Sequence, residues 1–357
     1  MLVSSDFHIP LFSSVYPGNH NDPTMFAGVV DELVARYKLF AKECDDITLV
    51  FDGGNPSTEN MKIVSKSDYN FITSLTLTSH KDLLEIPLTG FKTFSDPRLQ
   101  GTSAHRAKKV VWGAERAIVV TRSEKLLAGQ LAGINASLKK KRAELRNLAG
   151  KLRRSQMPGA KGKGYTQESL KKRLDVITTG QYISEILKIE ITKARGRLEF
   201  RYWTDVPAFK KLEQTRLGKR ILCSNNVLWT TEEIIFGSRA QSCIENAFRD
   251  MKDPHWISAT PAFHWTDQKL RVHFFYCVIS LTLTSLLLRK AANANQKISM
   301  QELYGQLTDV VEVVNLYPSS AKGGKCRAEY VLSERSPLQE KLCKLFNVYN
   351  LSRAQAS

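Results

Sequence analysis

This sequence lacks paired cysteines, zinc-binding spacings and any recognisable targeting segment. Its six cysteines, at positions 44, 223, 243, 277, 326 and 343, are scattered, with no CxxC pair and no Cys/His zinc spacing. That pattern argues against disulfides and zinc, and it is typical of thiols in a reducing cytoplasm. The residues after Met1, Leu-Val-Ser-Ser-Asp, form neither a basic n-region nor an apolar h-region, so we expect no secretory signal.

Long hydrophobic runs are also scarce. The one membrane candidate is Phe274 to Leu288, FFYCVISLTLTSLLL. These residues fall short of the roughly 20 needed to span a bilayer, and they include Ser and Thr. We therefore expect a buried core helix and no membrane partner.

Acidic residues are few relative to basic ones. The chain has 52 Lys and Arg against 35 Asp and Glu, a net charge of +17. Residues 101–220 contain 29 basic and 10 acidic side chains, whereas residues 1–100 contain 8 and 13, and residues 221–357 contain 15 and 12. The middle third thus predicts a polyanionic partner, with nucleic acid ahead of an anionic membrane surface.

The first hundred residues are typical of an α/β fold. The segments LVSS and IPLFSSVYPG predict a β-hairpin, and a helix is predicted from Asp22 or Thr24 to Phe40. The run ITLVF predicts a buried central strand that ends at Asp52, before two glycines. Because ligands and metals in α/β sheets bind beyond the carboxyl ends of strands, Asp52 is a candidate ligand. A turn aspartate is the simpler alternative.

The middle third combines strands with a basic helical hairpin. ERAIVVT and RLEFRYW predict strands, and Glu124 to Arg154 predicts a long helix between them. A Pro- and Gly-containing stretch, QMPGAKGKGY, precedes a second helical run, ESLKKRLDVITTGQYISEIL. The densest positive charge begins at Lys139, Lys140, Lys141 and Arg142, which we interpret as a track for DNA phosphates. A coiled-coil arm for dimerisation, or a merely solvated helix, is the alternative.

The stretch from Ser238 to Lys252, SRAQSCIENAFRDMK, predicts one amphipathic helix. Its apolar stripe, suited to packing on a sheet, contains Ile244, Ala247, Phe248 and Met251. A quarter-turn away, an arc of about 60° contains Ser238, Gln241, Glu245 and Lys252, with Arg249 beside them. One carboxylate flanked by cations suits a metal and DNA site, although an ordinary solvated face has the same pattern.

With these motifs together, the chain resembles bacterial insertion-sequence transposases of the DDE class, insertion-sequence-4 superfamily. The resemblance is carried by IPLFSSVYPGNHND, LVFDGGNPSTEN, the basic insertion and IENAFRDMKDPHWISATPAFHWTDQKLRVHFFYC. It implies an α/β, ribonuclease-H-like fold: a mixed five-stranded sheet with flanking helices and a basic, mostly helical insertion. It also implies strand cleavage and transfer at the inverted-repeat ends of an element, in double-stranded DNA.

The resemblance assigns roles to individual residues. Asp52 and Glu245 would be two of three carboxylates that hold Mg²⁺, with Mn²⁺ as a substitute, for two-metal phosphoryl transfer. Lys252, Arg239 and Arg249 would contact DNA, together with the basic run of the insertion. The partners implied are the element ends and a second copy, as a homodimer on DNA, in the cytoplasm at the nucleoid.

The sequence departs from the family pattern in three places. Ser238 stands where a Tyr is usual and Gln241 where an Arg is frequent, which leaves Arg239 as the compensating contact. The first Asp of the triad belongs to the first strand of the fold, and this chain is expected to begin at the second. Asp6, in the hairpin turn, is a poor substitute, so we expect impaired cleavage. The upstream DNA-binding region is expected to be missing too.

Four segments are expected. Residues 1–100 would form the first part of the catalytic core, 101–220 the basic insertion, 221–295 the second part of the core with the Glu245 helix, and 296–357 a helical tail. Two other functions stay open: a non-catalytic DNA-binding remnant that regulates transposition, and a nuclease unrelated to transposition. Metal-dependent cleavage would distinguish a transposase from the remnant. A requirement for inverted repeats would distinguish a transposase from the nuclease.

Overall fold

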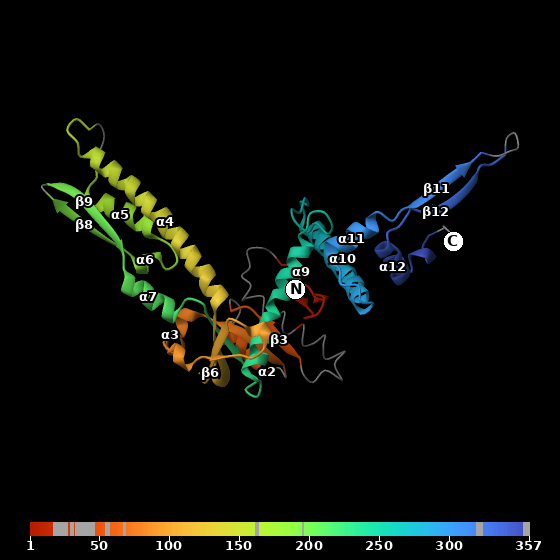
Figure 1. Cartoon of the computed structure of the whole chain (residues 1–357), viewed down its shortest axis with the longest axis horizontal. Helices are drawn as coiled ribbons and strands as arrows, with labels where there is room; N and C mark the ends of the chain where they lie inside the picture. The colour runs from red at the N-terminus through yellow and green to blue at the C-terminus, as the bar shows by residue number, and fades with distance from the viewer. Residues whose placement is uncertain are drawn as a thin grey trace. The chain divides into compact units, whose positions relative to one another are not determined.

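The computed structural model describes residues 1–16, 28, 32, 47–53, 58–66, 69–160, 164–194, 196–318 and 324–352. The chain forms two compact units (Figure 1). The first, Cys44–Ser238, is called the sheet unit, and the second, Met1–Glu43 with Arg239–Ser357, the helical unit. The helix predicted from Asp22 or Thr24 to Phe40 lies outside the described residues, apart from positions 28 and 32.

The sheet unit is built on a mixed six-stranded sheet, which confirms the α/β class. Its strands are β3 (Thr48–Phe51), β4 (Asn70–Leu75), β5 (Lys92–Thr93), β6 (Thr102–Val111), β7 (Ala114–Ser123) and β10 (Lys219–Ser224). Their order is β3-β4-β10-β7-β6-β5, and only β3 and β4 are parallel. The resemblance implied five strands, and the apolar run ITLVF predicted a central position for the strand before Asp52. Instead β3 is the outer strand among those described, so the central position was wrong.

Helices cover both faces of this sheet. Ile234 and Ile235 of α8 (Thr231–Arg239) pack with Ile72 and Leu222 on one face. α8 approaches so closely that a Cβ on Gly237 would lie 2.3 Å from Ile72 Cδ1. On the other face Arg116 of β7 donates to Ser65 Oγ of α2 (Thr58–Lys66) at 2.8 Å. Short elements complete the unit: η1 (Leu77–Ser79), α3 (Lys81–Leu84), η2 (Leu88–Gly90) and η3 (Pro97–Leu99).

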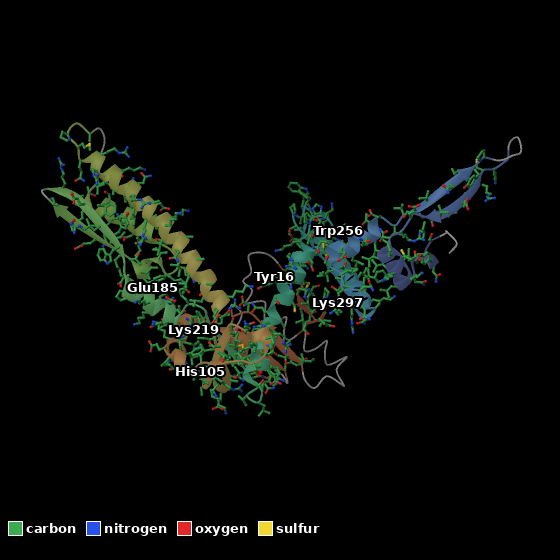
Figure 2. All side chains as sticks on the ribbon, viewed as in Figure 1. Tyr16, His105, Glu185, Lys219, Trp256 and Lys297 are labelled. Atoms are coloured by element: carbon green, nitrogen blue, oxygen red, sulfur yellow. The ribbon has the colours of Figure 1, made fainter. Side chains whose placement is uncertain are left out.

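An arm is inserted between β7 and β10. It comprises α4 (Glu124–Ser155), α5 (Gln167–Thr178), α6 (Ile183–Ile186), β8 (Leu187–Ala194), β9 (Arg197–Thr204) and α7 (Val206–Thr215). The predicted long helix is confirmed as α4, but the second helical run is interrupted after Thr178, where Gly180 and Tyr182 adopt positive φ angles. Glu185 of α6 (Figure 2) bonds Arg216, which follows α7, at 2.8 Å. Since β6 and β7 belong to the sheet, the arm begins at Glu124 within the predicted 101–220 segment.

The helical unit contains helices and two small hairpins. The predicted N-terminal hairpin is confirmed as β1 (Leu2–Val3) and β2 (Pro10–Phe12). The other elements are α9 (Gln241–Met251), α10 (Asp267–Asn293), α11 (Met300–Thr308), β11 (Glu312–Tyr317), β12 (Arg327–Leu332), α12 (Pro337–Phe346) and η4 (Val348–Asn350). α10 contains the apolar run Phe274 to Leu288, yet only 22% of its most apolar 18-residue window is buried. The expectation of a buried core helix was therefore wrong. By length and composition α10 would suffice to cross a membrane.

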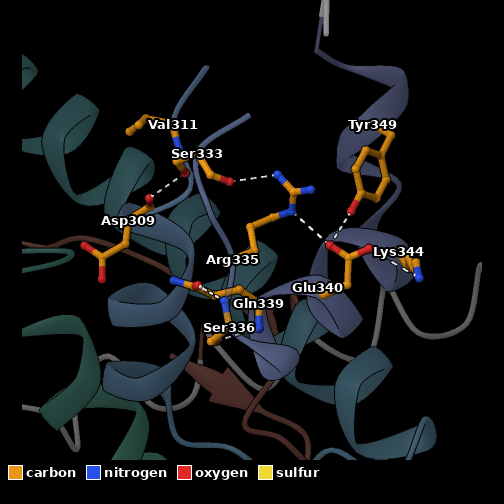
Figure 3. Close-up of polar contacts among 9 residues, drawn as sticks. All are labelled: Asp309, Val311, Ser333, Arg335, Ser336, Gln339, Glu340, Lys344 and Tyr349. Atoms are coloured by element: carbon orange, nitrogen blue, oxygen red, sulfur yellow. Dashed lines mark hydrogen bonds and ion pairs between the residues drawn. The ribbon is translucent and has the colours of Figure 1, made fainter. Parts of the chain in front are cut away.

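The end of the helical unit is fixed by one carboxylate (Figure 3). Glu340 Oε2 accepts hydrogen bonds from Tyr349 Oη at 2.6 Å and from Arg335 Nε at 2.9 Å, and Glu340 Oε1 pairs with Lys344 at 3.2 Å. These donors, Tyr349 and Arg335 foremost, lower the pKa of Glu340 to about 2. Ser336 caps α12 reciprocally with Gln339. The segment after β12 is thereby held against α12.

Candidate functional site

Asp52 lies directly after β3, as predicted, with an exposed side chain. Its Oδ1 accepts the backbone N–H of Gly53 at 2.7 Å, and the same N–H lies 3.1 Å from Ser74 Oγ on β4. Only glycine fits at position 53, because a Cβ there would lie 2.7 Å from the carbonyl oxygen of Ser74. The close approach of the two strands thus fixes the backbone that presents Asp52.

Glu245 lies on α9, and its side chain is exposed. The predicted single helix from Ser238 to Lys252 is divided, because α8 ends at Arg239 and α9 begins at Gln241. Thr230 and Glu233 form a reciprocal cap, with hydrogen bonds of 2.7 and 3.2 Å, and this cap starts α8. The sheet is accordingly covered by the isoleucines of α8 and not by the stripe of α9.

The apolar side of α9 packs within the helical unit. Ala247 and Met251 are buried with Cys277 and Leu281 of α10, and Met1 and Val3 pack against them. The opposite side exposes Glu245, Arg249 and Lys252, as the predicted arc requires. The amphipathic character of this helix was therefore predicted correctly, but the surface on which its apolar side packs was not.

The three cations predicted near Glu245 are all exposed. Arg249 approaches Asp250 at 3.8 Å, a weak surface contact, and Lys252 Nζ lies 5.9 Å from the ring centre of Phe248. Arg239 ends α8, where its carbonyl accepts Ser242 Oγ at 2.8 Å. Burial, in contrast, raises the pKa of the neighbouring Asp250 carboxyl.

The two predicted metal ligands belong to different units, Asp52 to the sheet unit and Glu245 to the helical unit. Among the described residues, no group of three or more His, Cys, Asp or Glu side chains is positioned to hold a metal ion.

The four successive cations predicted as a phosphate track do not share one face of α4. Lys139 and Lys140 are exposed, but Lys141 Nζ lies 3.8 Å from Glu144 and Arg142 Nη2 donates to Thr204 Oγ1 at 2.7 Å. Successive helical residues are 100° apart, so a run of four spreads around the helix. The four cations therefore do not form a single straight row along α4.

A different set of cations is aligned along α4. At 100° per residue, an arc of about 60° contains Lys139, Arg142, Arg146 and Arg153, here called the arm row. All four are exposed, and the buried leucines Leu138, Leu145 and Leu152 lie on another side of the helix. Arg146 and Arg153 were not predicted as site residues. Their seven-residue spacing on a helix already predicted was the signal that would have found them.

The arm row follows the free edge of β9. Gln156, at the end of α4, donates to the Leu198 carbonyl at 2.9 Å and accepts the Leu198 N–H at 2.7 Å. Arg142 bonds Thr204 at the other end of β9. The two contacts are fourteen residues apart along α4 and six residues apart along β9, and each interval spans about 20 Å. Because the later residue of α4 contacts the earlier residue of β9, the two elements run antiparallel over that length. These bonds fix which side of α4 the row occupies.

The other side of α4 faces α5 across a groove of about 490 Å³. Lys151 lines it from α4, and Lys172 and Arg173 line it from α5. Glu144 lies in the same groove, and Lys172 pairs with Glu168 at 2.9 Å. Positive charge is therefore partly offset here, whereas the arm row contains no carboxylate.

The outer face of the β8–β9 hairpin adds further exposed side chains. β9 alternates strictly, with Arg197, Glu199, Arg201 and Trp203 exposed and the residues between them half-buried. Tyr202, Phe200 and Leu198 pack against the arm core. The hairpin contributes two more cations to the same arm.

The root of the arm is fixed to the sheet by hydrogen bonds. Ser123 N–H donates to the Gly218 carbonyl and Glu124 N–H to the Gly101 carbonyl, both at 2.9 Å. Gly218 N–H donates to Gln130 Oε1 of α4 at 2.7 Å. Because α4 follows β7 without a linker, the arm row extends from the sheet on a rigid helix.

Comparison with known proteins adds no family or structural relative. No family model matches the chain, and neither a curated protein nor a solved structure matches it significantly.

Proposed function

We propose that this chain binds double-stranded DNA through the arm row, as part of a transposase of the DDE class. The observation that carries DNA binding is the alignment of Lys139, Arg142, Arg146 and Arg153 on one exposed side of a helix fixed to the sheet. DNA is a regular polyanion, and a rigid row of cations matches its backbone without a cost in ordering.

The length of the row suits a DNA backbone. From residue 139 to residue 153 a helix rises about 21 Å, along which one strand of duplex DNA carries about six phosphates. Arg142 uses one N–H for Thr204, and a guanidinium has five. The row therefore supports about four phosphate contacts without base recognition, which positions DNA and leaves sequence reading to other side chains.

Duplex binding as a function of salt tests this proposal. Four phosphate contacts predict that log K falls against log[salt] with a slope of about −3.6 from the row alone. Fluorescence anisotropy with a labelled duplex, measured from about 50 to 200 mM salt, gives the slope. A slope near zero would remove DNA from the list of partners.

The resemblance extends the proposal to strand cleavage and transfer at inverted-repeat ends, on a ribonuclease-H-like sheet. Asp52 and Glu245 are the proposed ligands of Mg²⁺ or Mn²⁺, with Arg239, Arg249 and Lys252 on the DNA. Support comes from the exposure of both carboxylates and from the position of Asp52 at a strand end. The cytoplasm, at the nucleoid, is the proposed location, and a homodimer the proposed state on DNA.

Cleavage of an end-containing duplex tests the catalytic part. The proposed transposase cuts in Mg²⁺ or Mn²⁺ only when inverted repeats are present, and at the impaired rate expected from the sequence. Asp52→Ala or Glu245→Ala abolishes the cut while leaving duplex affinity within twofold. Cleavage that does not need the repeats would indicate a nuclease instead. Cleavage retained in both variants would remove these two carboxylates from the mechanism.

The second candidate is a non-catalytic DNA-binding regulator. It is favoured by the absence of a three-carboxylate cluster among the described side chains, combined with an aligned basic arm. This candidate predicts DNA binding with the same salt slope and no cleavage with either metal. It also predicts that Asp52→Ala leaves every measured property unchanged.

A further inference from the structure

α10 presents an apolar stripe that no described element of the helical unit covers. Its members lie at helical spacings of three, four and seven residues, and they are 37–64% exposed: Val272, Phe275, Tyr276, Ile279, Leu283 and Leu286. The opposite side of the same helix is buried within the helical unit through Cys277, Leu281 and Thr284. Figure 1 shows α10 with α11 and α12, its neighbours on that buried side.

The stripe is symmetric about its centre. Val272, Ile279 and Leu286 are seven residues apart, the spacing by which one helix packs along another. In an antiparallel pair centred on Ile279, Val272 lies opposite Leu286 of the other copy, and Phe275 lies opposite Leu283. These contacts join a larger and a smaller apolar side chain, or two isoleucines, and Tyr276 lies opposite Thr282. The stripe is thus complementary to itself, as a twofold interface must be.

The exposed area fits a weak dimer. Phe275 and Tyr276 are 60% and 64% exposed, and a covered aromatic side chain buries about 150–250 Å². With the four aliphatic residues, the stripe offers on the order of 500 Å² per copy. Two copies would together bury about 1,000 Å², the lower limit of a specific interface.

We infer that the α10 stripe is the self-association surface of this protein, which joins two copies through antiparallel α10 helices. The inference goes beyond the proposed function, since it needs no DNA. From Val272 to Leu288 the helix carries no Lys, Arg, Asp or Glu, so like charges meet only beyond the stripe, where Lys269 lies opposite Arg289 of the other copy. A bilayer is a poorer occupant, because the packed neighbour α9 exposes Glu245, Arg249 and Lys252 and would bring them toward hydrocarbon.

Sedimentation velocity on the full chain, without DNA, tests the inference first. The wild type is expected to change from monomer to dimer as its concentration rises. Ile279→Glu places two carboxylates against each other at the twofold axis and is expected to raise the dimer Kd about 100-fold or more. The matched control is Val176→Glu on the arm, an equally charged change at a residue 72% exposed, which should leave the Kd unchanged.

Cysteine cross-linking tests the antiparallel geometry. In a Cys326→Ser background, which removes an exposed native thiol, Ile279→Cys should oxidise to a covalent dimer. Phe275→Cys alone should not, and the double variant Phe275→Cys with Leu283→Cys should. A chain that stays monomeric at all concentrations would overturn the inference, as would a dimer unaffected by Ile279→Glu. Binding of the wild-type monomer to phospholipid vesicles, lost in Ile279→Glu, would assign the stripe to a membrane instead.

Discussion

Gly218, at the root of the arm, is a position where one methyl group should disturb the junction. Its φ of +74° lies in the left-handed region, which costs a residue with a Cβ roughly 1–2 kcal/mol. A Cβ there would also lie 3.0 Å from both the Ser123 carbonyl oxygen and Leu127 Cβ. Crowding of this kind costs about 1–3 kcal/mol. We therefore expect Gly218→Ala to lower the free energy of unfolding of the sheet unit by about 2–5 kcal/mol.

A glycine within α4 provides the control. Gly129 has no atom within 4 Å of its would-be Cβ and lies in the helix interior, so Gly129→Ala should stabilise by about 0.8 kcal/mol. Urea unfolding followed by circular dichroism measures both variants. A Gly218→Ala protein as stable as the wild type would show that the root does not have the described geometry.

Two titrating side chains each predict stability that rises with pH, one in the alkaline range and one in the acid range. Burial, aided by nearby Arg122, lowers the pKa of Lys219 to about 8, below the unfolded value of about 10.4, so stability should rise with pH between these values; Lys219→Met should remove that rise in urea titrations at pH 7 to 10. Glu340 acts in the acid range: its pKa of about 2 lies below the unfolded value of about 4.3, so its contribution is full above about pH 4.3 and lost as pH falls toward 2. Glu340→Gln should flatten this acid dependence, and an unchanged acid midpoint would contradict the account.

Local patterns in the sequence predicted most individual elements. The strand before Asp52, the long helix from Glu124 and the N-terminal hairpin all depend on hydrophobic periodicity and caps within a few residues.

The packing of these elements against one another could not be predicted from local patterns. The sequence does not say which of two adjacent apolar helices covers the sheet, and α8 does so with Ile234 and Ile235 while α9 packs on α10. An apolar run does not reveal how much of it will be covered, so α10 was expected to be buried. Strand order is equally non-local: β3 pairs only with β4 among the described strands, although its composition suggested a central position.

In the candidate site, too, local features were predicted and the tertiary arrangement was not. Asp52 and Glu245 were placed correctly on a strand end and an exposed helix face, but the sequence could not show that they belong to separate units. For the arm, charge density drew attention to four successive residues, whereas binding geometry depends on residues three, four and seven apart. Lys141, engaged with Glu144, illustrates why density alone is a poor guide.

The most direct test of DNA binding by the arm row compares two triple variants with equal changes in charge. The first replaces Lys139, Arg146 and Arg153 of the row by Ala, and the second replaces Lys140, Lys151 and Lys172 on the groove side of the same arm. The quantity measured is the salt slope of duplex affinity. Removing three phosphate contacts should reduce the magnitude of the slope by about 2.7 in the first variant, while the second retains the wild-type slope to within about 1. Equal slopes in the two variants would contradict the account, because they would mean that only net charge, and not the alignment along α4, governs binding.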